Sequence, residues 1–294
     1  MNAAVVSPTH TALRHHGRMD SPQATEPVLL VEVAERVATL TLNRPAQRNA
    51  LSSALLAALR MEMARVDAAE DVDVIVLTGA DPAFSAGLDL KELGSTGNNL
   101  VVEGPRETPA ETGSTPPERV AASIVPWAPT RKPVIGAING VAVTGGFELV
   151  LQCDFAVASE RASFGDTHTR VGILPGWGLS VLLPQAIGVR RAIEMSLTGN
   201  FIGAEEAHRL GLVNHVVAHD DLLATAHRLA RDISGNDAAA LQELLRSYRA
   251  IHRMTVGDGE HHEATVTRNW RRTYRPGDVA AKRAAIQARG RTQV

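Results

Sequence analysis

Cysteine is almost missing from this 294-residue sequence. Cys153 is the single one, so no disulfide framework within the chain can stabilise the fold. This cysteine usage is typical of a protein of the reducing cytoplasm. No basic residue stands beside Cys153, so we interpret it as a small buried hydrophobic residue and not as a nucleophile.

A strong net charge and long apolar runs are missing as well. The 30 Lys and Arg residues nearly balance the 32 Asp and Glu residues, for a formal net charge of −2. This balance argues against a nucleic-acid partner and against a general attraction to membranes. No apolar run approaches transmembrane length, and the first residues lack the apolar core of a signal peptide.

The patterns that are present alternate between strand and helix and predict an α/β fold. The β-rich runs 28–33 and 37–42 are separated by three residues, as in a hairpin. Ser52 is a candidate N-cap for a helix with one apolar face. The run 73–77, which is continuously apolar after Asp73, is typical of a strand that is buried on both faces of a sheet. Strand, helix and strand in this order predict parallel β/α units.

Three parts of the chain differ in pattern. Residues 1–26 lack periodicity and predict a disordered N-terminal tail. Residues 27–201 carry the strand and helix patterns of the core, including an irregular stretch at 94–117 that predicts either a loop beside the active site or a surface insertion. Residues 202–294 are predicted to be a helical C-terminal region, with helices expected at 222–233, 238–252, 260–270 and 279–289. Because few strands remain there, we expect these helices to cover the core or another subunit.

The stretch from Asn139 to Asp154 carries the clearest chemistry. A buried apolar strand leads into a turn, and Gly145-Gly146 then opens a helix that contains Glu148. Glycines at a helix start leave backbone N–H groups that can approach and stabilise an oxygen as it becomes negative. A carboxylate within the same helical turn suits proton transfer on a carbon next to a carbonyl.

This stretch resembles the oxyanion and glutamate segment of the crotonase family, the enoyl-CoA hydratase/isomerase superfamily. Further segments match the family pattern in the same order: Phe84 to Lys91, Phe164-Gly165, Gly172 to Gly176, and Thr198-Gly199 to Val213. The match covers the chain from about Val28 onward. The resemblance implies a crotonase-type β/α spiral core and a helical C-terminal oligomerisation region, with a homotrimer or a dimer of trimers as the assembly.

The resemblance also implies an acyl-CoA thioester as substrate, with coenzyme A as part of the substrate and no metal or redox cofactor. It assigns Glu148 as a catalytic acid or base and the N–H groups of Ala86 and Gly145 as the oxyanion hole. Residues beside these motifs are expected to bind substrate: Gly87, Leu88, Asp89 and Gly146. Asp89 has an alternative role as a helix cap. Arg44 and Lys91 are candidates for contacts with the coenzyme A phosphates.

One position departs from the family pattern. Hydratases of this family use two glutamates on one water molecule, and His168 stands where the second glutamate is expected. A neutral imidazole can accept a proton from water near pH 7, which predicts His168 as a second catalytic residue. The alternative is a structural histidine bonded to Asp166 or to the backbone. An enoyl-CoA hydratase is the leading hypothesis; a Δ3,Δ2-enoyl-CoA isomerase and a non-catalytic acyl-CoA-binding relative are the alternatives.

Overall fold

The computed structural model describes residues 26–100, 126–273 and 275–292. The predicted N-terminal tail therefore falls almost entirely outside the described residues. Of the predicted loop at 94–117, only residues 94–100 are described, and they contain the end of a short helix and one 3-10 turn.

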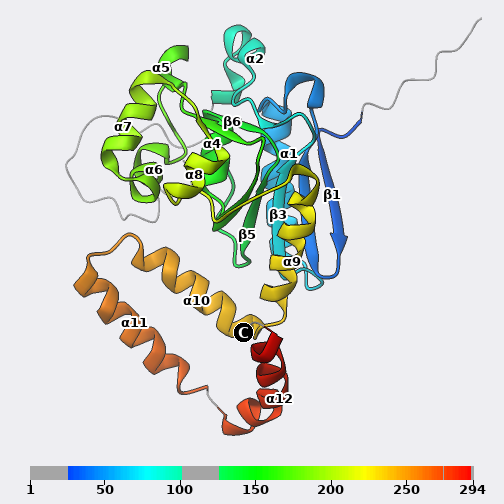
Figure 1. The fold of residues 1–294 in the computed structure, drawn as a ribbon, viewed down its shortest axis with the longest axis vertical. Coiled ribbons are helices and arrows are strands. Elements are labelled where there is room, and N and C mark those ends of the chain that lie inside the picture. The colour runs from blue at the N-terminus through cyan, green and yellow to red at the C-terminus, as the bar shows by residue number, and fades with distance from the viewer. Residues whose placement is uncertain (1–25, 101–125, 274, 293–294) are drawn as a thin grey trace, which may run out of the picture.

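A six-stranded sheet forms the centre of the molecule (Figure 1). Its first two strands are antiparallel and the others run parallel, which confirms the predicted hairpin and parallel units. In spatial order the strands are β1 (Leu29–Ala34), β2 (Val37–Leu42), β3 (Val74–Gly79), β5 (Val134–Ile138), β7 (Phe155–Ser159) and β10 (His215–Val217).

Both faces of this sheet are buried. Along β3, Ile75 and Leu77 point into the main core, while Val74 and Val76 point into a smaller core on the opposite face. Helix α1 (Ser53–Ala68) contributes its apolar side to the main core, and α9 (Leu222–Ser234) covers the smaller one. The Ser52 hydroxyl accepts from the Leu55 N–H at 3.2 Å, so the predicted N-cap is confirmed.

A second, four-stranded sheet carries the functional stretch. Its order is β4 (Ala83–Ser85), β6 (Val141–Val143), β8 (Ser163–Gly165) and β9 (Ile202–Gly203), and its first three strands are parallel. Helix α4 (Gly145–Leu151) follows β6 and packs against β4 and β6. Strands of two or three residues carry too little periodicity to be predicted from sequence.

Short helices surround these sheets. They are α2 (Leu90–Ser95), α5 (His168–Val171), α6 (Leu179–Ile187), α7 (Val189–Thr198) and α8 (Ala204–Arg209), with 3-10 turns η1 (Pro45–Gln47), η2 (Asn98–Leu100) and η3 (His219–Asp221). Among the described residues, no helix combines the length and apolar character needed to cross a bilayer.

Three C-terminal helices lie beside the core and not over it: α10 (Ala238–Ile251), α11 (Val256–Trp270) and α12 (Pro276–Thr292). We call them the C-terminal arm. In Figure 1, α10 and α11 form an antiparallel hairpin below the body, and α12 lies near the end of α9. Arg249 connects α10 to the core through Asp154, with N–O distances of 2.8 and 2.6 Å.

The predicted boundary after residue 201 does not separate two packing units. Strand β10 pairs with β7 in the main sheet, and α9 buries Leu222, Ala226 and Ala230 against that sheet. The core therefore extends through α9, and only the arm from residue 238 stands apart. The sequence groups α9 with the arm because both have the same helical periodicity, whereas the buried residues of α9 place it on the core.

Candidate active site

Glu148 is held at the start of α4 by backbone donors from a distant loop. Its Oε1 accepts from the Trp177 N–H at 2.7 Å and, less closely, from the Leu179 N–H at 3.4 Å. The side chain is 3% exposed. These bonds orient the carboxyl group and leave Oε2 directed toward His168, whose Nε2 lies 3.5 Å away.

His168 lies between two carboxyl groups. On its other side, Nδ1 is 2.6 Å from Asp166 Oδ1, and the His168 backbone N–H also donates to Asp166 at 3.2 Å. Burial alone would lower the pKa of His168, but the hydrogen bonds and charges of Asp166 and Glu148 outweigh it and raise the pKa to about 9. The imidazole is therefore protonated at neutral pH. It is both bonded to Asp166, as one prediction held, and turned toward Glu148.

Burial raises the pKa of Asp166, yet the net direction is downward because the His168 ring, the Ser196 hydroxyl and the His168 N–H all stabilise the carboxylate. Asp166 follows β8 directly, and α5 begins at His168. This strand-to-helix turn brings the two side chains into contact. At neutral pH His168 is therefore a proton donor. This is the reverse of the proton-accepting role predicted from the ordinary histidine pKa.

The oxyanion donors need one correction. The Ala86 N–H donates to the Arg48 carbonyl at 2.9 Å, so Ala86 has no free N–H for a substrate oxygen. Two residues on, the Leu88 N–H has no acceptor among the described residues, and the same holds for the Gly145 N–H at the start of α4. Leu88 and Gly145 line one cavity with Glu148 and His168. The geometry therefore favours Leu88, in place of Ala86, as the partner of Gly145.

Glycines allow the two donor segments to touch. A Cβ on Gly87 would lie 1.9 Å from the Thr144 Oγ1 and 2.7 Å from the Val143 carbonyl oxygen, and the φ of Gly87 is +83°. A Cβ on Gly146 would lie 2.5 Å from the Ser85 carbonyl oxygen. Both glycines were predicted to bind substrate, but they act here as close-packing residues that are not part of the cavity lining.

Asp89 has a structural role in the fold. It caps α2 by accepting from the N–H groups of Lys91 and Glu92, and it pairs with Arg44 at 2.8 Å. This structural role is the alternative that the sequence offered for Asp89. The Arg44 guanidinium also donates to the Ala50 carbonyl. These two bonds within the fold argue against the predicted contact of Arg44 with the coenzyme A phosphates. Lys91 is exposed beside this pair, and its side chain forms no hydrogen bond or ion pair with the described residues.

The cavity measures about 60 Å³ and lies between α1, η2, α4 and the loop before α6. Besides the reacting groups it is lined by Trp177, Ile173 and Leu174, which supply apolar surface, and by Arg60 and Asn99. Asn99 donates to the Leu51 and Asp89 carbonyls, and its Oδ1 has no hydrogen-bond partner among the described residues. Sequence reasoning missed the Trp177 amide, Arg60 and Asn99, because their positions depend on how separate segments come together. Trp127 packs in the main core.

The arrangement can stabilise an enolate oxygen with two amides while a carboxyl group and an imidazolium move protons beside it. Among the described residues, no group of three His, Cys, Asp or Glu side chains suits a metal ion.

Comparisons with known proteins agree with this chemistry. The Enoyl-CoA hydratase/isomerase family model matches residues 32–274. A protein of Arabidopsis thaliana named probable enoyl-CoA hydratase 1, peroxisomal, is 40% identical over 201 residues, or 68% of this chain and 70% of the relative. A probable enoyl-CoA hydratase of Rhizobium meliloti is 37% identical over 234 residues, or 79% of this chain and 84% of the relative.

Solved structures give the same family. An enoyl-CoA hydratase from Mycobacterium smegmatis is 48% identical with a TM-score of 0.66, and the match covers 84% of this chain and 100% of that one. A monofunctional enoyl CoA isomerase from M. smegmatis is 29% identical with a TM-score of 0.62, covering 81% of this chain and 98% of that one. The chain therefore belongs to the enoyl-CoA hydratase/isomerase family, the crotonase family that its motifs resemble.

Proposed function

We propose that the protein is an enoyl-CoA hydratase, which adds water across the double bond of a 2-enoyl-CoA thioester. The observation that carries the proposal is the pair of Glu148 and His168, 3.5 Å apart in a cavity that the Leu88 and Gly145 residues also line. The hydratase names of the relatives support the same reaction.

In the proposed reaction the thioester oxygen accepts hydrogen bonds from the Leu88 and Gly145 N–H groups. Glu148 takes a proton from water as the water oxygen bonds to the β-carbon, and electron density moves to the thioester oxygen as an enolate. His168 then gives its proton to the α-carbon, and the product is a 3-hydroxyacyl-CoA. One oxyanion donor contributes about 3–4 kcal/mol to such a transition state.

An isomerase is the second candidate. Glu148 contributes the only carboxyl group to the described lining of the cavity, and a single carboxyl group can move a proton between two carbons of one acyl chain. A protonated His168 favours hydration, because it supplies the second proton-transfer group that isomerisation by Glu148 alone does not need. A non-catalytic acyl-CoA-binding relative is the third candidate.

Turnover assays separate these candidates. The wild-type protein is incubated with 2-enoyl-CoAs of four to sixteen carbons and with matching 3-enoyl-CoAs, and products are identified by mass. We expect loss of the 2-enoyl absorbance with gain of one water, and a rate about 10²–10⁴-fold lower for Glu148→Gln. Glu205→Gln, an exposed glutamate of α8, is the matched control and should keep the wild-type rate.

The outcomes are distinct. Conversion of 3-enoyl-CoA without hydration would assign the isomerase, and tight binding without turnover of any thioester would assign the non-catalytic relative. Equal rates for Glu148→Gln and wild type would remove Glu148 from the reaction. Absence of a metal or redox cofactor stays a prediction; assaying enzyme treated with chelator tests the metal, and the absorption spectrum of the purified protein tests the redox cofactor.

We also propose a homo-oligomer, a homotrimer or a dimer of trimers, in the cytoplasm. The weak burial of the C-terminal arm supports the oligomer: α10 and α11 each bury one residue, Ser247 and Gly259, while Leu244, Tyr248 and Val256 are exposed. The free cysteine is consistent with a reducing compartment. Light scattering and microscopy of tagged protein test the two statements.

A further inference from the structure

The cavity beside Glu148 is lined by one buried residue whose hydrogen bonding is incomplete. Asn99 is 4% exposed, and its Oδ1 has no hydrogen-bond donor among the described residues. Buried side-chain oxygens are nearly always hydrogen-bonded, because an unpaired oxygen has lost its bonds to water without replacement. A donor for Asn99 Oδ1 is therefore expected from a molecule that enters the cavity.

The other end of the Asn99 amide fixes its orientation. Nδ2 donates to the Leu51 carbonyl at 3.2 Å and to the Asp89 carbonyl at 3.0 Å. Turning the amide over would place Oδ1 against these two carbonyl oxygens, to which an oxygen without a hydrogen cannot donate. Asp89 adjoins the oxyanion residue Leu88, so Asn99 is held against the segment that binds the thioester oxygen in the proposed reaction.

Arg60 adds a cationic donor to the lining of the same cavity. No acidic residue lies three or four positions from Arg60 along α1, where an ion pair on one helix would form. Its side chain forms no ion pair or hydrogen bond with the described residues. An acceptor at Asn99 and a donor at Arg60 together suit a group that both donates and accepts, as a hydroxyl group does.

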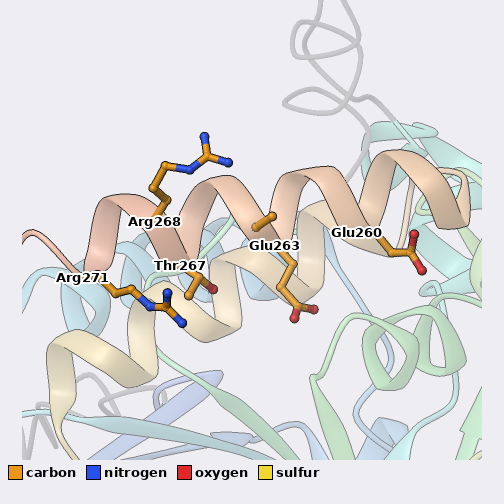
Figure 2. Close-up of a pocket in the computed structure, with 6 residues that line it drawn as sticks. Glu260, Glu263, Thr267, Arg268 and Arg271 are labelled. Atoms are coloured by element: carbon orange, nitrogen blue, oxygen red, sulfur yellow. The ribbon is translucent and has the colours of Figure 1, made fainter.

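The hollow on α11 lacks a group of this kind. It measures about 440 Å³, and Figure 2 shows its glutamates toward the N-terminal end of the helix and its arginines toward the C-terminal end. The six residues that line it are all exposed, so water can bond to their polar atoms. Among the described residues, no buried side-chain nitrogen or oxygen other than Asn99 Oδ1 lacks a partner.

A 2-enoyl-CoA with a plain hydrocarbon chain leaves Asn99 without its donor. In the proposed reaction the thioester oxygen faces the Leu88 and Gly145 amides, while Glu148 and His168 face the carbons of the double bond. The remaining chain carries only C–H groups, which are weak donors. A stronger donor can come from a substituent on the acyl chain or from the amide N–H groups of the coenzyme A arm.

We propose that Asn99 and Arg60 form a specificity subsite for a hydroxyl group that the acyl chain carries beyond the β-carbon. The hydroxyl group donates to Asn99 Oδ1, and its oxygen accepts from the Arg60 guanidinium. The substrate class is then a hydroxylated 2-enoyl-CoA. This inference rests on the proposed function, because it assigns the substrate of the same site.

Matched six-carbon substrates test the subsite. Wild-type protein is assayed with 2-hexenoyl-CoA, with its 4-, 5- and 6-hydroxy derivatives and with their methyl ethers. We define the hydroxyl preference as kcat/KM for the best hydroxylated substrate divided by kcat/KM for 2-hexenoyl-CoA. It should be about 10–100, because the unsubstituted chain leaves polar groups of the site unpaired. The methyl ether keeps the oxygen but cannot donate, so it should lose the advantage.

Variants connect the preference to the two side chains. Asn99→Leu and Arg60→Met should each bring the hydroxyl preference close to one. The preference is a ratio within one variant, so any damage to the Leu88 segment that slows both substrates cancels. Arg65→Met, which removes another exposed arginine of α1, is the matched control and should keep the wild-type preference.

Three results would overturn the subsite. The first is equal kcat/KM for hydroxylated and unsubstituted substrates in the wild type. The second is a hydroxyl preference that survives both substitutions; an equal loss for all substrates in Asn99→Leu would assign Asn99 to the coenzyme A arm or to the fold. The third is a stronger preference for 2-hexenedioyl-CoA, which would assign Arg60 alone to a carboxylate.

Failure of the proposed function gives a different result, namely no turnover of any enoyl-CoA. Calorimetric binding of hexanoyl-CoA and its hydroxylated derivatives then measures the same preference without a reaction. Tighter binding of a hydroxylated derivative, lost in Asn99→Leu and Arg60→Met, would support the subsite, and equal affinities would overturn it.

Discussion

His168 takes its chemistry from the two carboxyl groups that flank it. A histidine free in water loses its proton near pH 6.5, but between Asp166 and Glu148 the protonated form is stabilised to about pH 9. The same side chain is then an acid instead of a base at neutral pH. Asp166 is a positioning residue in this description, since it contacts His168 and is not part of the cavity lining.

Asp166→Asn should move the pH dependence of the reaction. Wild-type kcat is expected to hold through neutral pH and to fall above about pH 9, as His168 loses the proton that it donates. Without the Asp166 charge the pKa of His168 decreases, so the fall should begin at lower pH. Rate measurements from pH 6 to 10 check this. A profile that rises with pH would show His168 to act as a base.

The free energy of unfolding should also depend on pH through the protonation of His168. The pKa of His168 is raised from 6.5 to about 9 in the folded protein, so its contribution to the free energy of unfolding is complete below about pH 6.5 and is lost as pH rises through about 9. Chemical unfolding at several pH values in this window measures the slope. His168→Gln should flatten it; an unchanged slope would assign the titration to another group.

At the scale of elements, the site depends on a close approach between the segment after β4 and the start of α4. Gly87 touches the Thr144 side chain and the Val143 carbonyl, and this contact sets the Leu88 and Gly145 amides on one cavity. Gly87 is not among the residues that line the cavity. It removes the side chain that would separate the two donor segments.

Gly87→Ala should therefore damage both stability and catalysis. The positive φ costs about 1–2 kcal/mol for any residue with a Cβ, and the forced shift of Thr144 adds about 1–3 kcal/mol. Thermal unfolding and enoyl-CoA turnover measure the two effects. Gly94→Ala in α2 is the control, because its added Cβ meets no atom within 4 Å. Equal behaviour of the two variants would contradict this role.

At the scale of the whole molecule, one polar cluster connects helix α10 of the C-terminal arm to the core. Arg249 in α10 binds both oxygens of Asp154 and donates to the Thr130 carbonyl, and Asp154 also accepts from the Val134 N–H at 2.8 Å. One bidentate pair thus connects the arm, the end of α4 and the entry to β5. Fork-shaped pairs of this kind fix orientation as well as adding energy.

Arg249→Met should loosen the arm and lower stability by about 2 kcal/mol, since charge-assisted bonds are lost and Asp154 is left without a cation. Denaturant unfolding gives the energy, and hydrogen exchange of α10 gives the location. Arg246→Met, which removes an exposed pair with Glu243 one turn earlier, should cost less than about 1 kcal/mol. Similar losses for both variants would rule out the special role of Arg249.

Periodicity along the sequence was sufficient for the long elements. The hairpin, the double-sided strand β3 and the helices α1, α9 and α10 follow from apolar spacing and caps, which are local properties. The short strands of the second sheet were not predicted, because two or three residues carry no period. Helix α9 was predicted, with the core or another subunit as the surface that it covers, because one apolar stripe does not specify that surface; the structure places it on the main sheet.

For the site, the sequence by itself determined the family, Glu148, Gly145 and the unusual His168, because these lie in continuous motifs. Only the tertiary structure decided that the Ala86 N–H is used by Arg48, that Leu88 and Trp177 offer their amides to the site, and that Asp166 and Glu148 keep His168 protonated. The physical reason is the separation along the chain of the residues that set each property. Motifs are set by neighbours along the chain, whereas a free amide or a shifted pKa depends on groups brought together from distant segments.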